Sequence, residues 1–334
     1  MILSRSERIA LMARLGEYLL SDDPSWLEVK REATRKNPWF IPAFVDRAVH
    51  EIAEAYLSPH KLEQWLAAYP ETGKPAAVKD VGLVLAGNIP AVGFHDFLCG
   101  FMSGHHLSLK VSSRDAVLIP HWIDMLTQWS SGLESQIHIR EMLKGCDAYI
   151  ATGSNNSARY FAYYFGKYPH IIRRNRTSVA VLDGTETPEE LQGLADDVLL
   201  YFGLGCRNVT KLYVPEGYDF SALEQAFSRY GFLQDVHHYH DNFDYNLSLL
   251  LLNQIPYRTD GTVLLVEQKQ WFSPISVLYY ETYREPEAVW KALEGSEDLQ
   301  GVVGHRERPF GSAQSPALSD YADRVDTLAF LNTL

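Results

Sequence analysis

Cysteine is scarce in this sequence of 334 residues, and its spacing excludes two kinds of site. There are three cysteines, no two of which form a C-x-x-C pair: Cys99, Cys146 and Cys206. An odd number of cysteines without that spacing predicts neither a disulfide framework nor a four-cysteine zinc site. We therefore expect a protein of a reducing compartment, with no metal.

Positive charge and long apolar runs are scarce as well. Lys and Arg number 30 against 42 Asp and Glu, and the resulting net charge of −12 suits a nucleic-acid backbone poorly. The most apolar stretch, residues 81–102, is interrupted by polar residues that include Asn88 and Asp96. A membrane span needs about 20 largely apolar residues. We expect no nucleic-acid partner and no membrane span.

The first residues lack the apolar core of a secretory signal. Arg5, Glu7 and Arg8 stand where such a signal would be uninterruptedly apolar. We therefore expect a cytoplasmic, soluble protein. The composition, with 46% hydrophobic and 22% charged residues, is that of an ordinary globular chain, and the length is typical of two domains.

The sequence pattern changes near residue 79. Segments 6–20 and 42–68 predict a helical N-terminal layer, with no strand pattern between them. After it, short apolar runs alternate with helical segments. The predicted strands are 81–87, 106–111, 148–152 and 177–182, and the predicted helices are one opening at Pro90, 116–129 and 155–168. This alternation predicts an α/β fold with a parallel, doubly wound sheet.

A helix with strong start signals begins at Pro188. Thr187 can cap it, and Glu190 completes a capping box. Its apolar residues form one stripe: Leu191, Leu194, Ala195, Val198, Leu199 and Phe202. We expect this helix to end near Gly203 and the domain to change near Gly205. The predicted segments are 1–78, 79–204, 205–304 and 305–334.

Cys206 is the candidate nucleophile among the cysteines. It follows a glycine-containing helix-to-strand junction and precedes Arg207, whose charge favours the thiolate. The alternative is that Cys206 is a small buried apolar residue, as free cysteines often are. For Cys99, within an apolar helix, and Cys146, beside Gly145, we expect the buried alternative.

Polar residues follow three of the predicted strands. Asn88 follows the first strand and either caps the next helix or donates to an oxyanion at the carboxyl edge of the sheet. Thr152, Gly153 and Ser154 precede a helix whose N-terminus would suit a pyrophosphate, although Ser and Asn are also common caps. Residues 110–114 follow a third strand, and a solvated loop is their default interpretation.

Two further polar segments have simpler interpretations. His237, His238 and His240 have no acidic residue at H-E-x-x-H spacing and no paired cysteines, so we interpret them as a polar surface turn and not as a metal site. The charged segment 305–309 is expected to be a solvated loop.

Five segments together resemble, in their order along the chain, landmarks of the aldehyde dehydrogenase superfamily, and more specifically of its LuxC-type acyl-CoA reductase branch. They are Ala86-Gly-Asn-Ile-Pro90, Leu109-Lys-Val-Ser-Ser113, Ala151-Thr-Gly-Ser154, Gly203-Leu-Gly-Cys-Arg-Asn208 and Trp271-Phe-Ser-Pro274. The resemblance covers about residues 80–334. It implies a Rossmann-type cofactor domain over 79–204, a smaller α/β catalytic domain over 205–304 and a tail over 305–334.

The resemblance also implies roles for individual residues. Cys206 matches the nucleophile, and Asn88 matches the asparagine that shares the oxyanion hole with the nucleophile's own backbone N–H. The turn Thr152-Gly153-Ser154 matches the one against the cofactor pyrophosphate. Lys110 matches a lysine that binds the adenosine ribose, and Phe272 lies in the segment beside the nicotinamide ribose.

The resemblance bears on the choice of cofactor too. In NAD-preferring relatives the residue three after the matched lysine is commonly a glutamate, and here it is Ser113. A hydroxyl does not repel a 2′-phosphate, and Arg114 could add a cation, so we expect NADPH and leave NADH use open. The alternative is that Ser112 and Ser113 only cap a helix that begins near Asp115.

One departure from the family pattern indicates a particular reaction. Hydrolytic members carry a glutamate before the cysteine that activates the deacylating water, whereas this chain has Arg173-Arg-Asn-Arg176 in that neighbourhood. An enzyme that must not hydrolyse its acyl-cysteine needs no such base. We therefore predict reduction of a fatty acyl thioester, carried by CoA or by an acyl carrier protein, to the aldehyde.

Other departures and alternatives stay open. Gln270 and Ser273 replace a glutamate and a glycine of the family in the segment beside the nicotinamide ribose. A conventional aldehyde dehydrogenase and a non-catalytic acyl-binding protein of the same fold are the alternative functions. Homo-oligomerisation is also left open.

Overall fold

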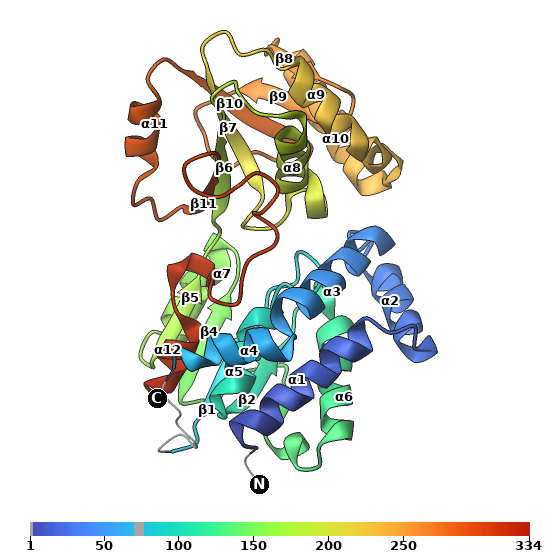
Figure 1. Ribbon diagram of the computed structural model, residues 1–334, viewed down its shortest axis with the longest axis vertical. Coiled ribbons are helices and arrows are strands. Elements are labelled where there is room, and N and C mark those ends of the chain that lie inside the picture. Colours follow the sequence, from blue (N-terminus) through green and yellow to red (C-terminus); the bar gives the residue numbers. More distant parts are fainter. Residues whose placement is uncertain (1–2, 70–76) are drawn as a thin grey trace. The chain divides into compact units, whose positions relative to one another are not determined.

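The computed structural model describes residues 3–69 and 77–334 and divides into two compact units (Figure 1). Unit 1 comprises Met1–Asn175 and Ala317–Leu334, and unit 2 comprises Arg176–Pro316. The change of domain predicted near Gly205 therefore falls inside unit 2. The reason is that the strand preceding Gly205 and the strand following it pair in one sheet.

Unit 1 begins with the predicted helical layer. Its helices are α1 (Arg5–Leu19), α2 (Pro24–Lys36), α3 (Pro42–Tyr56) and α4 (Pro59–Ala67). Ser4 and Glu7 form a capping box at the start of α1, and the other three helices have Pro in their first turn. Met12, Leu15 and Trp26 are fully buried and join the main core of the unit.

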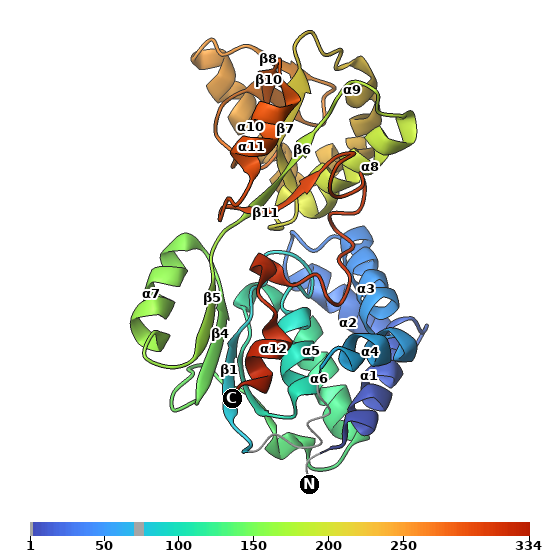
Figure 2. The same cartoon turned by 60° about the vertical axis from the view of Figure 1, so that its left-hand side comes forward.

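The sheet of unit 1 is parallel, with the strand order β3-β2-β1-β4-β5. Its strands are β1 (Asp80–Val84), β2 (His106–Lys110), β3 (Ile137–Ile139), β4 (Ala148–Thr152) and β5 (His170–Arg173). Helices α5 (Phe94–Ser103) and α12 (Thr327–Asn332) lie on one face and α7 (Asn155–Phe165) on the other, while α6 (Leu118–Trp129) contacts α1 and α2 (Figure 2). The order reverses between β1 and β4, so the carboxyl ends of these two strands form the topological switch point of the sheet.

Two helix starts in unit 1 differ from the prediction. The helix expected from Pro90 begins at Phe94, because a turn with Ala91 at φ 53° comes first, and an α-helix cannot contain that left-handed conformation. The helix expected from residue 116 begins at Leu118, after a short 3₁₀ turn over Ser113–Asp115. β4 has the predicted bounds.

Unit 2 has a sheet of its own, with the order β11-β6-β7-β10-β9-β8, in which β8 is antiparallel to β9 and the other pairs are parallel. Its strands are β6 (Thr177–Val181), β7 (Val209–Pro215), β8 (Tyr257–Thr259), β9 (Leu264–Glu267), β10 (Val277–Tyr283) and β11 (Leu299–Val303). Its helices are α8 (Pro188–Leu199), α9 (Ser221–Phe227), α10 (His237–Leu252) and α11 (Pro286–Leu293). The predicted strand 177–182 thus belongs to this second sheet and not to the first.

The strongest sequence signals of unit 2 are confirmed, with one shorter helix. Thr187 and Glu190 form the predicted capping box of α8, and Pro188 stands at its first turn. The helix ends at Leu199 instead of near Gly203, because the following 3₁₀ segment contains left-handed residues at Tyr201 and Phe202.

The histidine-rich segment is helical, so its interpretation as a surface turn is wrong. His237, His238 and His240 form the start of α10. Helical spacing brings Tyr239 and Phe243 into the core of the unit, and tertiary burial of this kind outweighs the polar composition of the segment.

The described residues contain neither a cluster of metal ligands nor a helix that could span a membrane. Across residues 3–69 and 77–334, no group of three or more His, Cys, Asp or Glu residues is placed to hold a metal ion. Within the same ranges, no helix has the length and apolar character needed to cross a bilayer.

Candidate functional site

The carboxyl edge of the unit 1 sheet gathers Asn88, the predicted oxyanion donor, and the predicted cofactor residues of this unit. Asn88 follows β1, Lys110 ends β2 and Thr152 ends β4, and β1 lies between the other two strands. Parallel strands present their carboxyl ends at the same edge, so these loops are neighbours there. Lys110 is exposed, whereas Asn88 and Thr152 are half-buried.

The start of α7 combines a cap with a close approach of backbone. The Ser154 hydroxyl accepts a hydrogen bond from the Ser157 N–H at 3.2 Å, which is a helix cap. A Cβ on Gly153 would lie 2.8 Å from the Ser157 Cβ and 2.9 Å from the ring of Phe161, so only glycine fits between β4 and α7. The helix N-terminus at this edge carries the partial positive charge that favours phosphate.

In the loop after β2, Ser112 caps a 3₁₀ turn, whereas its neighbours Lys110 and Ser113 are exposed. The Ser112 hydroxyl accepts from the Arg114 N–H at 3.2 Å and so caps the 3₁₀ turn, as the alternative interpretation expected. The side chains of Lys110 and Ser113 are exposed at the same edge. A Cβ on Gly87 would come within 2.7 Å of the Ser112 Cβ, which shows how closely the loops after β1 and β2 pack.

Asp115, which sequence reasoning did not select, fixes the turn that carries Asn88. Its Oδ2 accepts a hydrogen bond from the Ala91 N–H at 2.7 Å, and the residue is 2% exposed. Burial raises the pKa of Asp115 to about 6, against the lowering effect of the Ala91 N–H. In the sequence it looks like an ordinary acidic residue in the first turn of a helix, and no local signal links it to Ala91.

A buried ion pair lies beneath the Thr152 turn. Nη1 of Arg173 lies 2.7 Å and 2.6 Å from the two carboxylate oxygens of Asp96, and its Nη2 donates to the Thr327 hydroxyl at 2.7 Å. The Thr152 hydroxyl donates to the same Asp96 carboxylate at 3.5 Å. Burial alone would lower the pKa of the Arg173 guanidinium, but Asp96 raises it above its ordinary value. Arg173 thus compensates a negative charge next to the candidate pyrophosphate turn.

In unit 2, Cys206 lies in the short connection between the 3₁₀ segment after α8 and β7. It is half-buried, whereas Cys99 and Cys146 are 0% and 2% exposed. Burial raises the pKa of both buried thiols, well above the ordinary value in the case of Cys99. Of the three thiols, Cys206 is therefore the most exposed.

Phe272 lies in a loop attached to the strand that follows Cys206. The Thr210 hydroxyl donates to the Trp271 carbonyl at 2.5 Å, and the fully buried Lys211 donates to the Lys269 carbonyl at 2.8 Å. Both anchoring side chains belong to β7, which pairs with β10. The structure therefore brings the Cys206 and Phe272 loops together before adjacent parallel strands, and Phe272 is 44% exposed.

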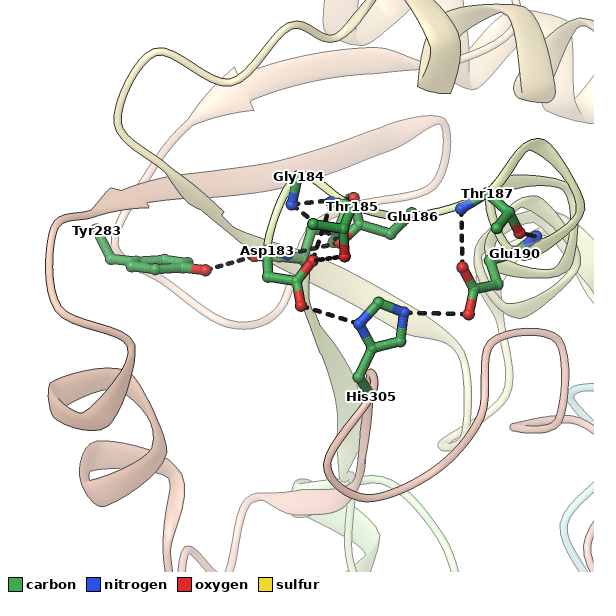
Figure 3. Close-up of polar contacts among 9 residues, drawn as sticks. Asp183, Gly184, Thr185, Glu186, Thr187, Glu190, Tyr283 and His305 are labelled. Atoms are coloured by element: carbon green, nitrogen blue, oxygen red, sulfur yellow. Dashed lines mark hydrogen bonds and ion pairs between the residues drawn. The ribbon is translucent and has the colours of Figure 1, made fainter.

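The segment 305–316, which we name the strap, is anchored at its start by His305 (Figure 3). The Nδ1 of His305 lies 2.9 Å from Asp183 and its Nε2 lies 3.0 Å from Glu190. Two carboxylates can only accept, so the doubly protonated imidazole satisfies both contacts, and the hydrogen bond to Asp183 raises the pKa of His305. Burial alone would raise the pKa of Asp183, but hydrogen bonds from Thr185 and His305 bring it down to about 2. Residues 305–307 are exposed, as expected of a solvated loop, but the fold also brings two acceptors to His305.

A second anchor of the strap is Asp197 of α8. This carboxylate is fully buried and accepts from the Gly311 N–H at 2.7 Å and the Ala313 N–H at 2.8 Å. Burial raises the pKa of Asp197 to about 7, although the two N–H groups lower it. The helix that leads to Cys206 therefore also fixes the strap.

No family model and no curated protein matches this sequence. Solved structures with a similar fold include an NAD-dependent aldehyde dehydrogenase from Sinorhizobium meliloti, with a TM-score of 0.66 and 13% identity over 90% of this chain and 70% of that one. Aldehyde dehydrogenase 21 from Physcomitrella patens has a TM-score of 0.65 and 14% identity over 90% and 74% of the chains. Succinic semialdehyde dehydrogenase from Streptococcus pyogenes, solved with NADP⁺, has a TM-score of 0.66 and 14% identity over 90% and 76%. The expected α/β fold of aldehyde dehydrogenase type is confirmed.

Proposed function

We propose that this protein is an acyl-CoA reductase that uses NADPH to reduce a fatty acyl thioester to the aldehyde through an acyl-cysteine at Cys206. The observation that carries the proposal is the environment of Arg173. Where the sequence resemblance would place the glutamate of a hydrolytic enzyme, this chain has a buried arginine bound to Asp96. Without a base to activate water at this position, an acyl-cysteine would persist until it is reduced.

The residues at the unit 1 edge fit a nicotinamide dinucleotide phosphate. In the proposal, the turn at Thr152–Ser154 and the α7 N-terminus bind the pyrophosphate, and Lys110 and Ser113 bind the adenosine ribose and its 2′-phosphate. Phe272 lies beside the nicotinamide ribose. When bound, the cofactor supplies two electrons as a hydride to the acyl carbon. No carboxylate stands within residues 110–114 to repel the 2′-phosphate.

The chain itself supplies the nucleophile and the oxyanion donors. The Cys206 thiolate forms a bond to the thioester carbonyl carbon, and Asn88 with the Cys206 N–H donates to the developing oxyanion. The bond from that carbon to the CoA sulfur then breaks, and CoA leaves with the electron pair as a thiolate. After the carbon has gained a hydride, the bond to Cys206 breaks, which releases the aldehyde and regenerates the thiolate.

The decisive assay offers the protein a panel of short, medium and long acyl-CoA thioesters with NADPH. We expect loss of the reduced nicotinamide absorbance together with formation of one aldehyde per NADPH consumed. Acid production from an aldehyde and NADP⁺, without thioester reduction, would instead establish a conventional aldehyde dehydrogenase. Absence of turnover with every thioester would overturn the proposal.

Intact-protein mass spectrometry tests the nucleophile separately. Without NADPH, acyl-CoA should add one acyl group to the wild type and to Cys146→Ala, and none to Cys206→Ala. The Cys146 variant is the matched control because it removes a buried thiol of the other unit. An adduct that persists in Cys206→Ala would sink the assignment.

A further inference from the structure

We propose that Asn208 is the positioning residue of the nucleophile: its side-chain amide fixes the turn that presents Cys206 by joining that turn to the end of α8. This inference rests on the proposed role of Cys206 and adds a residue to it. Asn208 is fully buried and lies two residues after Cys206.

Asn208 binds Gly205, the first residue of the turn, through both its backbone and its side chain. Its backbone N–H donates to the Gly205 carbonyl at 3.1 Å, and its Oδ1 accepts from the Gly205 N–H at 2.8 Å. Cys206 and Arg207 are the two residues between these contacts. One residue therefore holds both backbone groups of the position immediately before the nucleophile, which restricts the direction in which the Cys206 side chain leaves the turn.

The other half of the amide binds the end of α8. Its Nδ2 lies 3.1 Å, 3.2 Å and 2.9 Å from three carbonyl oxygens, which belong to Asp197, Val198 and Leu200. The last carbonyls of a helix lack partners within it, and here the left-handed residues Tyr201 and Phe202 end the helix. The amide thus links the helix terminus and the cysteine turn through a single rigid group.

The backbone of Asn208 adds a third attachment. Its carbonyl accepts from the Ser178 N–H at 3.0 Å and from the Thr177 hydroxyl at 3.2 Å. Both partners belong to β6, the strand beside β7. Because α8, β6 and the turn all meet at Asn208, the side chain cannot shorten without leaving polar groups of the turn and of α8 unpaired in the interior.

The alternative is that Asn208 stabilises the end of α8 and nothing else. The two interpretations differ at Gly205. If the amide only satisfied helix carbonyls, replacing Asn208 would change neither the protection of the Gly205 N–H nor the geometry of Cys206.

The test combines hydrogen exchange with acylation kinetics, well below the unfolding temperature of every variant. In the wild type, the Gly205 amide should exchange as slowly as the amides of β7. Asn208→Ala should speed that exchange at least tenfold and lower the maximal rate of Cys206 acylation by acyl-CoA about 100-fold, the cost of a nucleophile misplaced by about 1 Å, with the half-saturating thioester concentration unchanged.

The control is Tyr283→Phe. The Tyr283 hydroxyl of the same unit donates to the Leu182 carbonyl at 2.6 Å at the carboxyl end of β10, whereas the cysteine turn precedes the amino end of β7. Its loss should lower the melting temperature without changing acylation. A fall in acylation equal to that of Asn208→Ala would show that loss of stability alone explains both, and would overturn the proposal.

A second variant decides the question if Asn208→Ala does not fold. Asn208→Asp keeps an oxygen that can accept from the Gly205 N–H but loses the donor to the α8 carbonyls, so Gly205 should stay protected while the protein unfolds more easily. Fast Gly205 exchange in the wild type or in Asn208→Asp would refute the inference. Failure of every thioester to acylate the wild type would instead refute the proposed function, because the exchange measurements need no substrate.

Discussion

The turn that carries Asn88 and the turn that carries Cys206 are fixed in opposite ways. The Asn88 turn is fixed from a distance in sequence, by the carboxylate of Asp115 on the Ala91 N–H. The Cys206 turn is fixed from within, by Asn208 on Gly205. The Asn88 turn at the candidate binding edge therefore keeps its shape only if the strands of the sheet are correctly arranged. The turn of the candidate nucleophile is held by a residue of the same turn.

The two supports also differ in their response to pH. Asp115 is ionisable, with a pKa raised by burial to about 6, whereas the Asn208 amide does not titrate. A change of pH should therefore act directly on the Asp115 support of the Asn88 turn but not on the Asn208 amide. The ion pair of Arg173 with Asp96 is also a contact between residues far apart in sequence, because with Thr327 it joins β5, α5 and α12.

The largest effect is expected from Arg173→Met. Removing the guanidinium leaves the Asp96 carboxylate buried without its partner, and breaking such a pair costs about 3–5 kcal/mol. Chemical denaturation should report this as a lower free energy of unfolding. Arg31→Met, which removes an exposed ion pair with Glu28, is the control and should change stability far less. Equal losses in the two variants would mean that the buried Arg173–Asp96 pair contributes no more to the free energy of unfolding than an exposed pair.

Asn88→Ala comes next and tests the turn through catalysis. If Asn88 donates to the oxyanion, its loss should reduce the acylation rate about 100–1,000-fold, because the donor acts mainly in the transition state. Steady-state kinetics should show the loss in kcat with KM nearly unchanged. A variant with intact kcat would identify Asn88 as a cap or a loop residue only.

The pH dependence of stability should come partly from Asp115 and Asp197. Burial raises their pKa values to about 6 and about 7, so the folded protein keeps protons that the unfolded chain, with a carboxyl pKa of 3.8, has released. The free energy of unfolding should therefore fall as pH rises from about 4 to about 7, by at most about 1.4 kcal/mol per pH unit for each carboxyl, and level off above that range.

Asp197→Asn isolates one of these contributions. Urea denaturation across the pH range should show a flatter profile for this variant than for the wild type, with the difference confined to about pH 4–7. Parallel wild-type and Asp197→Asn profiles would contradict the role of burial.

Ser113→Glu should have the smallest effect and concerns the exposed edge. The wild type is expected to prefer NADPH, and a carboxylate at this position would repel the 2′-phosphate, which we expect to lower kcat/KM for NADPH about tenfold with little change for NADH. Ser113→Ala separates charge from loss of the hydroxyl. A wild type that prefers NADH, or an equal loss with both nucleotides, would contradict the assignment of this residue.

Local signals allowed much of the fold to be predicted. The alternation of apolar runs and helical segments predicted the α/β class, and Thr187, Pro188 and Glu190 located the start of α8 because caps act within one turn of the chain. The membership of β6 in the second sheet could not be predicted in this way, since strand pairing depends on partners far along the chain.

The same distinction applies to the candidate site. Asn88 and Thr152 are candidates because each follows an apolar run, whereas Lys110 is a candidate only through the family resemblance. The parallel sheet brings all three to one edge. Asp115 and Asn208 were not selected. Their importance lies in hydrogen bonds to backbone groups of turns, and the sequence does not show which N–H groups a fold leaves without partners.

The division of unit 1 into two stretches has a consequence for the order of synthesis. Residues 317–334 complete this unit, and they place Thr327 against Arg173 and α12 against α5. A ribosome makes the whole of unit 2 before it makes this closing segment. Unit 2 therefore precedes the closing segment in synthesis, and the face of α5 that α12 covers stays open until residues 327–332 have been made.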